Sequence, residues 1–138
     1  MTVELAEGYM PSPDEEFMNE NQLTYFRKKL VDWKEDILDL SKGTIHSMQE
    51  DNVHHPDLND RASSETDRAL ELRTRDRQRK LISKIESAIR RLDAGDYGYC
   101  EDTGNPISLK RLDARPIATL SLEAQEKHEQ REKVYRDA

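Results

Sequence analysis

Two histidines and two aspartates fall within seven residues, at His54, His55, Asp57 and Asp60. Imidazole and carboxylate groups at this spacing are potential ligands for a divalent ion, and metal-assisted hydrolysis is the chemistry they would support. No second histidine or carboxylate motif at ligand spacing accompanies them. We therefore expect Asp57 to be a turn residue and Asp60 a helix cap, and a metallohydrolase is a distant alternative.

Other motifs of catalysis are missing from the sequence. It has no glycine-rich phosphate loop, no G-x-S-x-G elbow and no Cys–His nucleophile pattern. The single cysteine, Cys100, excludes an internal disulfide, and the hydroxyl of Thr103 three residues later is a poor substitute for a second zinc-binding thiolate. We expect neither an enzyme nor a bound metal, and we expect Cys100 to be a small buried side chain.

Two long amphipathic segments flank the aspartates. The first carries apolar residues alternately three and four apart, a pattern typical of one side of a paired helix. Its apolar residues are Leu23, Phe26, Leu30, Trp33, Ile37 and Leu40. Two such segments joined by about ten residues predict an antiparallel coiled-coil hairpin over residues 17–92, with its tip at about 51–62. Asp57 and Asp60 would then lie at the end of arms about 45 Å long.

The rest of the chain predicts two smaller parts. Residues 1–16 hold few apolar side chains, and we expect a flexible N-terminal tail there. Residues 93–138 begin with closely spaced glycines and prolines, which predict tight turns in a small globular region, and a last helix should start near Ser121. The expected fold class is mainly α: a long antiparallel coiled-coil hairpin, a small globular region resembling a degenerate zinc finger, and a C-terminal helix.

Charge is unevenly distributed over the 138 residues. The net charge is −7, and residues 1–22 contain six acidic groups and no basic one. Basic residues gather on the second predicted helix, namely Arg73, Arg75, Arg77, Arg79, Lys80, Lys84, Arg90 and Arg91. The net charge argues against a protein that coats nucleic acid, while the basic row fits either a solvated face or a contact surface for an acidic partner. We expect no membrane span and no secretory leader, and hence a cytoplasmic location.

Six short motifs stand in an order and at spacings that match a known family. They are 16–20 (EFMNE), 57–62 (DLNDRA), 71–77 (ELRTRDR), 79–82 (RKLI), 97–100 (YGYC) and 111–116 (RLDARP). In these motifs the sequence resembles the DksA/TraR family of bacterial RNA polymerase-binding transcription factors. The resemblance covers about residues 17–135.

This resemblance implies a coiled-coil finger that enters the secondary channel of RNA polymerase without reading a DNA sequence. The family's tip pattern maps onto Asp57, Asp60 and Ala62, so two carboxylates on a rigid arm would act near the catalytic magnesium. Arg73 and Arg77 map onto the face that contacts the polymerase. Such factors alter open-complex stability, inhibiting ribosomal RNA promoters and activating some amino-acid biosynthesis promoters.

The resemblance also implies a co-regulator, the alarmone guanosine tetraphosphate (ppGpp). Its binding positions at the polymerase interface map onto Leu81, Lys84, Arg115 and Gln125, where cations suit an anionic nucleotide. A lysine is usual at the position of Gln125, so one charge is missing here.

The family's four zinc-binding cysteines correspond to Cys100, Thr103, Ser121 and Ala124. Only one thiolate ligand is left, and the sequence resembles the single-cysteine, zinc-independent type. Because no zinc–thiolate switch can form, we expect an activity that resists peroxide better than that of a four-cysteine relative.

Two further functions are alternatives at this point. A transcript-cleavage factor also inserts an acidic coiled-coil tip into the secondary channel, and a structural coiled-coil adaptor would have no polymerase role. We expect a monomer, since the hairpin buries its own seam.

Overall fold

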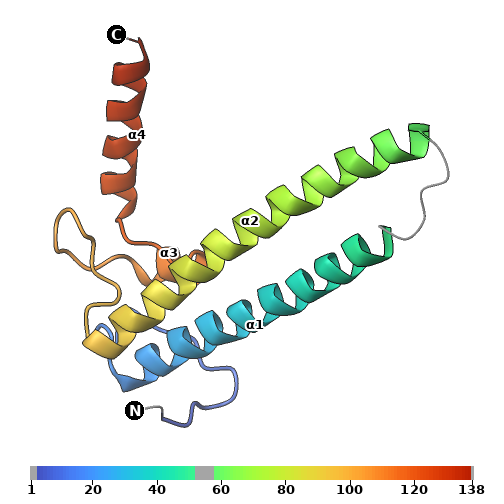
Figure 1. The fold of residues 1–138 in the computed structure, drawn as a ribbon. Coiled ribbons are helices and arrows are strands. Elements are labelled where there is room, and N and C mark those ends of the chain that lie inside the picture. The colour runs from blue at the N-terminus through green and yellow to red at the C-terminus, as the bar shows by residue number, and fades with distance from the viewer. Residues whose placement is uncertain (1–2, 52–57, 138) are drawn as a thin grey trace. The chain divides into compact units, whose positions relative to one another are not determined.

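The computed structural model describes residues 3–51 and 58–137, with side chains described for 3–43 and 64–135. Within these ranges the chain forms four helices: α1 (Glu20–Asp51), α2 (Leu58–Ala94), α3 (Leu109–Ala114) and α4 (Leu122–Asp137) (Figure 1). Within these described ranges no β-strand occurs, and an isolated antiparallel bridge joins Tyr99 to Pro106. The predicted mainly α class is confirmed. None of the described helices is apolar enough over its length to cross a membrane.

The chain divides into two compact units, and both long helices contribute to each. The first unit contains the residues up to Leu30 and those from Ser87 onward, and the second is Val31–Glu86. The second unit therefore consists of the parts of α1 and α2 nearest to the turn between them. The boundaries expected from sequence, after residues 16 and 92, stay predictions.

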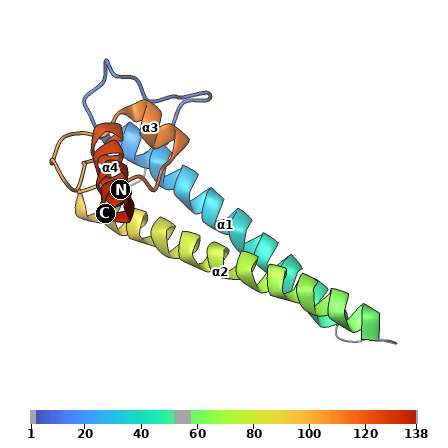
Figure 2. The same cartoon turned by 90° about the horizontal axis from the view of Figure 1, so that it is seen from above.

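In the second unit the two helices lie side by side and run in opposite directions (Figures 1 and 2). Lys34 Nζ lies 3.1 Å from Glu86 Oε1, and Ser41 Oγ donates to Gln78 Oε1 over 2.8 Å. As residue numbers rise along α1, those of the partners on α2 fall in step. This is the register of an antiparallel hairpin.

The seam between the two arms is less apolar than the spacing predicts. Ile37 and Ile85 are buried, but Leu40 is 63% exposed, so its expected place in the seam is wrong. The next residue, Ser41, takes that place and bonds to Gln78 instead. A polar contact therefore stands in the seam at the level where an apolar one was expected.

The first unit holds most of the apolar core. Its buried side chains come from the parts of α1 and α2 that belong to this unit and from the turn region, residues 95–121 between α2 and α4. They are Phe26, Leu30, Ala88, Leu92, Tyr97, Ile107 and Leu112. The rings of Phe26 and Tyr97 are 5.5 Å apart, and the Tyr97 hydroxyl donates to the Pro116 carbonyl oxygen over 2.7 Å. The turn region is thus held to the helices by packing and a buried hydrogen bond.

The segment before α1 makes specific contacts with that helix. Val3 N donates to Thr24 Oγ1, and the Tyr9 ring packs edge-on against Tyr25 with centroids 6.1 Å apart. Asn19 caps α1, since its Oδ1 accepts from Gln22 N over 2.9 Å. The mobility expected for residues 1–16 stays a prediction, and these are the contacts that would have to break.

The segment before α1 packs closely against the turn region at Gly98. Gly98 has φ 91°, and a Cβ there would lie 3.1 Å from Met18 Cε and 3.1 Å from Phe17 Cζ. Met18 itself has φ 55°. Glycine at position 98 is required both by its backbone angle and by its neighbours.

Candidate functional site

The expected tip residues are covered only in part by the described structure. Asp57 lies outside the described residues, as do His54 and His55. Asp60 and Ala62 belong to the start of α2, and their side chains are outside the described set. Their grouping as an acidic tip stays a prediction.

Arg73 and Arg77 lie four residues apart on α2 and are both exposed. This spacing places them on one face of the helix, one turn apart. Neither forms an ion pair with another residue whose side chain is described. Two guanidinium groups are thus available to an acidic partner, as the expected polymerase contact requires.

The expected ppGpp positions fall in both units. Leu81 is half-buried and Lys84 exposed on α2 in the second unit, whereas Arg115 and Gln125 belong to the first. Arg115 is the exposed C-cap of α3. The amide of Gln125 donates to Glu129 Oε1 over 3.2 Å, so a carboxylate lies beside the position where the family usually has lysine. A joint site made by these four residues stays a prediction.

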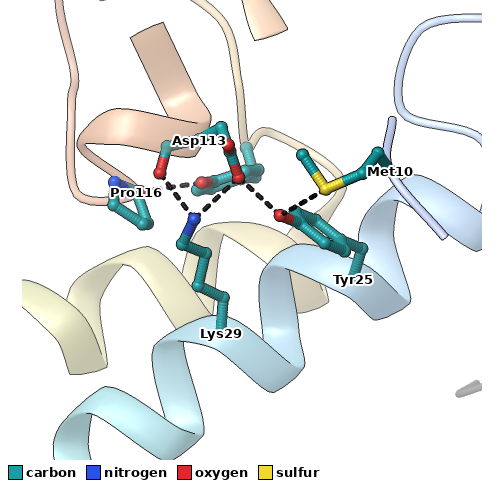
Figure 3. A network of polar contacts seen from close by, with 6 residues as sticks. Met10, Tyr25, Lys29, Asp113 and Pro116 are labelled. Atoms are coloured by element: carbon teal, nitrogen blue, oxygen red, sulfur yellow. Dashed lines mark hydrogen bonds and ion pairs between the residues drawn. The ribbon is translucent and has the colours of Figure 1, made fainter. Parts of the chain in front are cut away.

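A polar network beside Arg115 was not anticipated from the sequence (Figure 3). Lys29 Nζ on α1 donates to Asp113 Oδ1 over 2.7 Å and to the Asp113 carbonyl oxygen over 2.6 Å. The Tyr25 hydroxyl donates to the same Oδ1 over 2.5 Å. Two side chains of α1 thereby hold the end of α3, which carries the Asp113–Arg115 segment.

These bonds perturb the titration of both acidic groups. Hydrogen bonds from Lys29 and then from Tyr25 lower the pKa of Asp113, since both stabilise its carboxylate. Burial, with the hydrogen bond to Asp113, raises the pKa of Tyr25 to about 12. Asp113 is therefore ionised at neutral pH, and Tyr25 stays a donor.

The four positions expected to have lost their zinc ligands meet in the turn region. Cys100 is 2% exposed, which confirms its burial. Burial opposes ionisation of the thiol, but hydrogen bonds from the side chains and backbones of Thr103 and Ser121 outweigh it and lower the pKa of Cys100 to about 6. The predicted small buried side chain is thus confirmed.

This donor set does not fit a zinc ion. A structural zinc site needs four ligands drawn from thiolates, imidazoles and carboxylates, and these positions supply one thiol, two hydroxyls and the methyl group of Ala124. Backbone bonds hold the turn instead: Cys100 N to Asn105 O and Gly104 N to Cys100 O, each 2.8 Å. Nowhere in the described chain do three or more His, Cys, Asp or Glu side chains gather as a metal site.

Helix α4 is tied to this turn by a side-chain contact. His128 Nε2 lies 2.6 Å from Asp102 Oδ2, in the loop after Cys100. The Ser121 hydroxyl caps the same helix by accepting from Ala124 N over 3.2 Å. The start of α4 is therefore capped by Ser121, and its middle is joined through His128 to the loop that follows Cys100.

Comparisons with known proteins agree with this architecture. The model of the DnaK suppressor protein DksA, N-terminal domain, matches residues 22–92, and that of the prokaryotic dksA/traR C4-type zinc finger matches 95–130. The RNA polymerase-binding transcription factor DksA of Caulobacter vibrioides is 65% identical over 129 residues, covering 94% of this chain and 91% of the relative. The protein of the same name from Escherichia coli K12 is 44% identical over 93% of this chain and 85% of its own length.

A solved structure extends the likeness to three dimensions. Transcription factor DksA2 from Pseudomonas aeruginosa superposes with a TM-score of 0.82 at 40% identity, covering 88% of this chain and 93% of that one. By sequence and by fold, the chain belongs to the DksA/TraR family.

Proposed function

We propose that this protein is a transcription factor that binds RNA polymerase directly. The observation that carries the proposal is the 65% identity, over 94% of the chain, to a relative named as an RNA polymerase-binding transcription factor. Identity at this level, with both family models matched in order, supports a shared partner. The exposed arginines of α2 add a surface suited to an acidic protein face.

The mode of binding that we infer is insertion of the hairpin into the secondary channel of the polymerase. Helices of 32 and 37 residues are about 48 and 55 Å long at 1.5 Å per residue, which suits entry into a deep channel. Asp57, Asp60 and Ala62 would act at the tip, and Arg73 and Arg77 would contact the channel entrance. Support for these five roles comes from the sequence motifs.

The co-regulator that we propose is ppGpp, bound between this protein and the polymerase. Leu81, Lys84, Arg115 and Gln125 would contribute, with Lys84 and Arg115 supplying charge for the phosphates. Because Gln125 is neutral and bonded to Glu129, we expect weaker dependence on ppGpp than in relatives with lysine there. The effect on transcription would be inhibition of ribosomal RNA promoters and activation of some amino-acid biosynthesis promoters.

Several further properties follow from this proposal. The protein would act as a monomer in the cytoplasm, where its polymerase resides. It would have no catalytic activity of its own, would read no DNA sequence and would need no metal. The finger would rely on the hydrogen bonds around Cys100 in place of zinc.

In vitro transcription from a ribosomal RNA promoter tests the proposal. The wild-type protein should inhibit, ppGpp should deepen the inhibition, and Asp60→Asn should retain polymerase binding but lose the inhibition. A matched control is Asp67→Asn, a similar change at an exposed position further along α2. Equal inhibition by wild type and Asp60→Asn would refute the tip mechanism while leaving polymerase binding intact.

Assays with the same protein and polymerase distinguish this proposal from a transcript-cleavage factor and from a structural adaptor. A transcript-cleavage factor would release short RNA from a backtracked complex, and we expect none. A structural adaptor would fail to co-purify with the polymerase, whereas we expect a stoichiometric complex.

A further inference from the structure

The first unit contains a cavity whose lining includes none of the residues expected to meet the polymerase or ppGpp. Its volume is about 590 Å³, within the range of small-molecule sites. The segment before α1 forms one side and the residues leading into α3 form the other. Its apolar lining includes Met10, Pro11, Pro13, Phe17, Ile107 and Leu109.

Internal contacts fix both walls of this cavity. On one side the Glu15 carboxylate accepts from the Tyr9 hydroxyl over 2.8 Å and from Ser12 N over 2.8 Å, which closes the loop over residues 9–15. On that side, too, the Phe17 ring packs edge-on against Tyr99 with centroids 5.4 Å apart. The cavity is therefore a formed site, since its shape does not depend on a ligand to hold the segment in place.

The opposite wall is fixed in the same way. Ser108 caps α3 by accepting from Arg111 N over 3.2 Å, and Asp113 is held by Lys29 and Tyr25. These bonds occupy the Ser108 hydroxyl and the Asp113 carboxylate. Polar groups on this wall are thus mostly engaged within the protein.

Lys110 differs from the other polar groups that line the cavity. It is exposed and forms no ion pair or hydrogen bond with the described residues, whereas Glu15 and Asp113 are bonded by donors of the protein. Lysine has three donors and no acceptor, so the group that it would recognise is an anion. The lining also holds the carboxylates of Glu15 and Asp113, so an acidic head would have to lie at Lys110, with an apolar body filling the rest of the cavity.

We propose that this cavity binds a small amphipathic carboxylate, with its apolar body between the proline-rich segment and α3 and its carboxylate paired with Lys110. Ligand binding to the folded state would stabilise the first unit. The proposal is independent of the polymerase-binding function, because none of the residues assigned to that function lines the cavity.

The test is a titration of ¹⁵N-labelled full-length protein with sodium decanoate, decanol and decylamine, three probes that share an alkyl chain and differ in the head group. We expect decanoate to shift the amide signals of Phe17 and Leu109, to bind more tightly than decanol, and to raise the unfolding temperature. Decylamine should bind most weakly. Equal affinity for all three probes, or shifts confined to residues away from the cavity, would overturn the proposal.

Two variants and a control sharpen this titration. Lys110→Met should weaken decanoate binding about two- to fivefold, the value expected for a solvent-exposed ion pair, and leave decanol binding unchanged. Leu109→Trp should fill the cavity and weaken both probes. Lys133→Met removes an exposed lysine on α4 and should change neither. Unaltered decanoate affinity in either Lys110→Met or Leu109→Trp would refute the assigned site.

Discussion

Replacing Lys29 by methionine should destabilise the first unit measurably. The ammonium donates two short hydrogen bonds to Asp113, one to the carboxylate at 2.7 Å and one to the carbonyl oxygen at 2.6 Å. Methionine keeps the helix propensity and most of the side-chain length but removes both bonds. The carboxylate would then keep only the Tyr25 hydroxyl among the partners shown in Figure 3.

The size of the effect follows from charge and exposure. A hydrogen bond to a charged group contributes about 1.5–3 kcal/mol when well shielded. The side chains of Lys29 and Asp113 are 36% and 33% exposed, so solvent screening reduces this contribution. We expect Lys29→Met to lower the free energy of unfolding by about 2 kcal/mol, and Asp113→Asn by about 1 kcal/mol, since the carbonyl bond survives in the second variant.

Urea unfolding at pH 7 measures these values, and a double-mutant cycle isolates the carboxylate contact. Lys42→Met is the matched control, because Lys42 is an exposed lysine of the same helix and forms no ion pair with a described residue. Equal losses of stability in Lys29→Met and Lys42→Met would contradict this prediction, and so would a coupling energy between Lys29→Met and Asp113→Asn below about 0.3 kcal/mol.

The pH dependence of the pair provides an independent check. The folded pKa of Asp113 is lowered, so its contribution is present above the ordinary value of 3.8 and is lost as the pH falls through the folded pKa. The stability gap between wild type and Asp113→Asn should therefore be constant near neutrality and shrink below about pH 4. A gap that grows on acidification would contradict the assignment.

Three other predictions concern the turn region and the co-regulator. Gly98→Ala should destabilise by about 2 kcal/mol or more in urea unfolding, and Gly95→Ala by less, because both have positive φ but only Gly98 has neighbours within 4 Å of the added Cβ. The pKa of Cys100 is lowered from 9.0 to about 6. The difference in the free energy of unfolding between wild type and Cys100→Ser should therefore fall as the pH drops from 9 through 6. A difference that does not change with pH would argue against an ionised sulfur. Gln125→Lys should increase the stimulation of promoter inhibition by ppGpp, and an unchanged ppGpp titration would remove Gln125 from the proposed site.

Local patterns predicted three of the four described helices, whereas the glycines and prolines around α3 predicted only tight turns there. Apolar residues three and four apart predicted the long arms, and the start of the last helix near Ser121 was predictable because capping depends on neighbours three residues away. The prediction that Leu40 lies in the seam between the arms was wrong. Whether an apolar residue of α1 lies in the seam depends on how it packs against α2, and periodicity within α1 alone carries no information about that packing.

The polar network and the state of Cys100 lay beyond sequence reasoning. Lys29 and Asp113 are 84 residues apart, and nothing in their local surroundings marks them as partners. The loss of the zinc ligands was readable from residue types, because hydroxyl and methyl groups are poor zinc ligands. That the hydroxyls of Thr103 and Ser121 turn toward the remaining sulfur required the folded geometry.

The stepwise pairing of α1 with α2 limits how the length of the hairpin can vary. Removing seven residues from α1 alone would shift one arm by about 10 Å against the other and separate Ser41 from Gln78. Removing seven residues from each arm would delete two turns from both and restore the facing surfaces. Insertions and deletions in this hairpin should therefore be tolerated only as matched pairs of heptads. The two arms would then lengthen or shorten together in evolution.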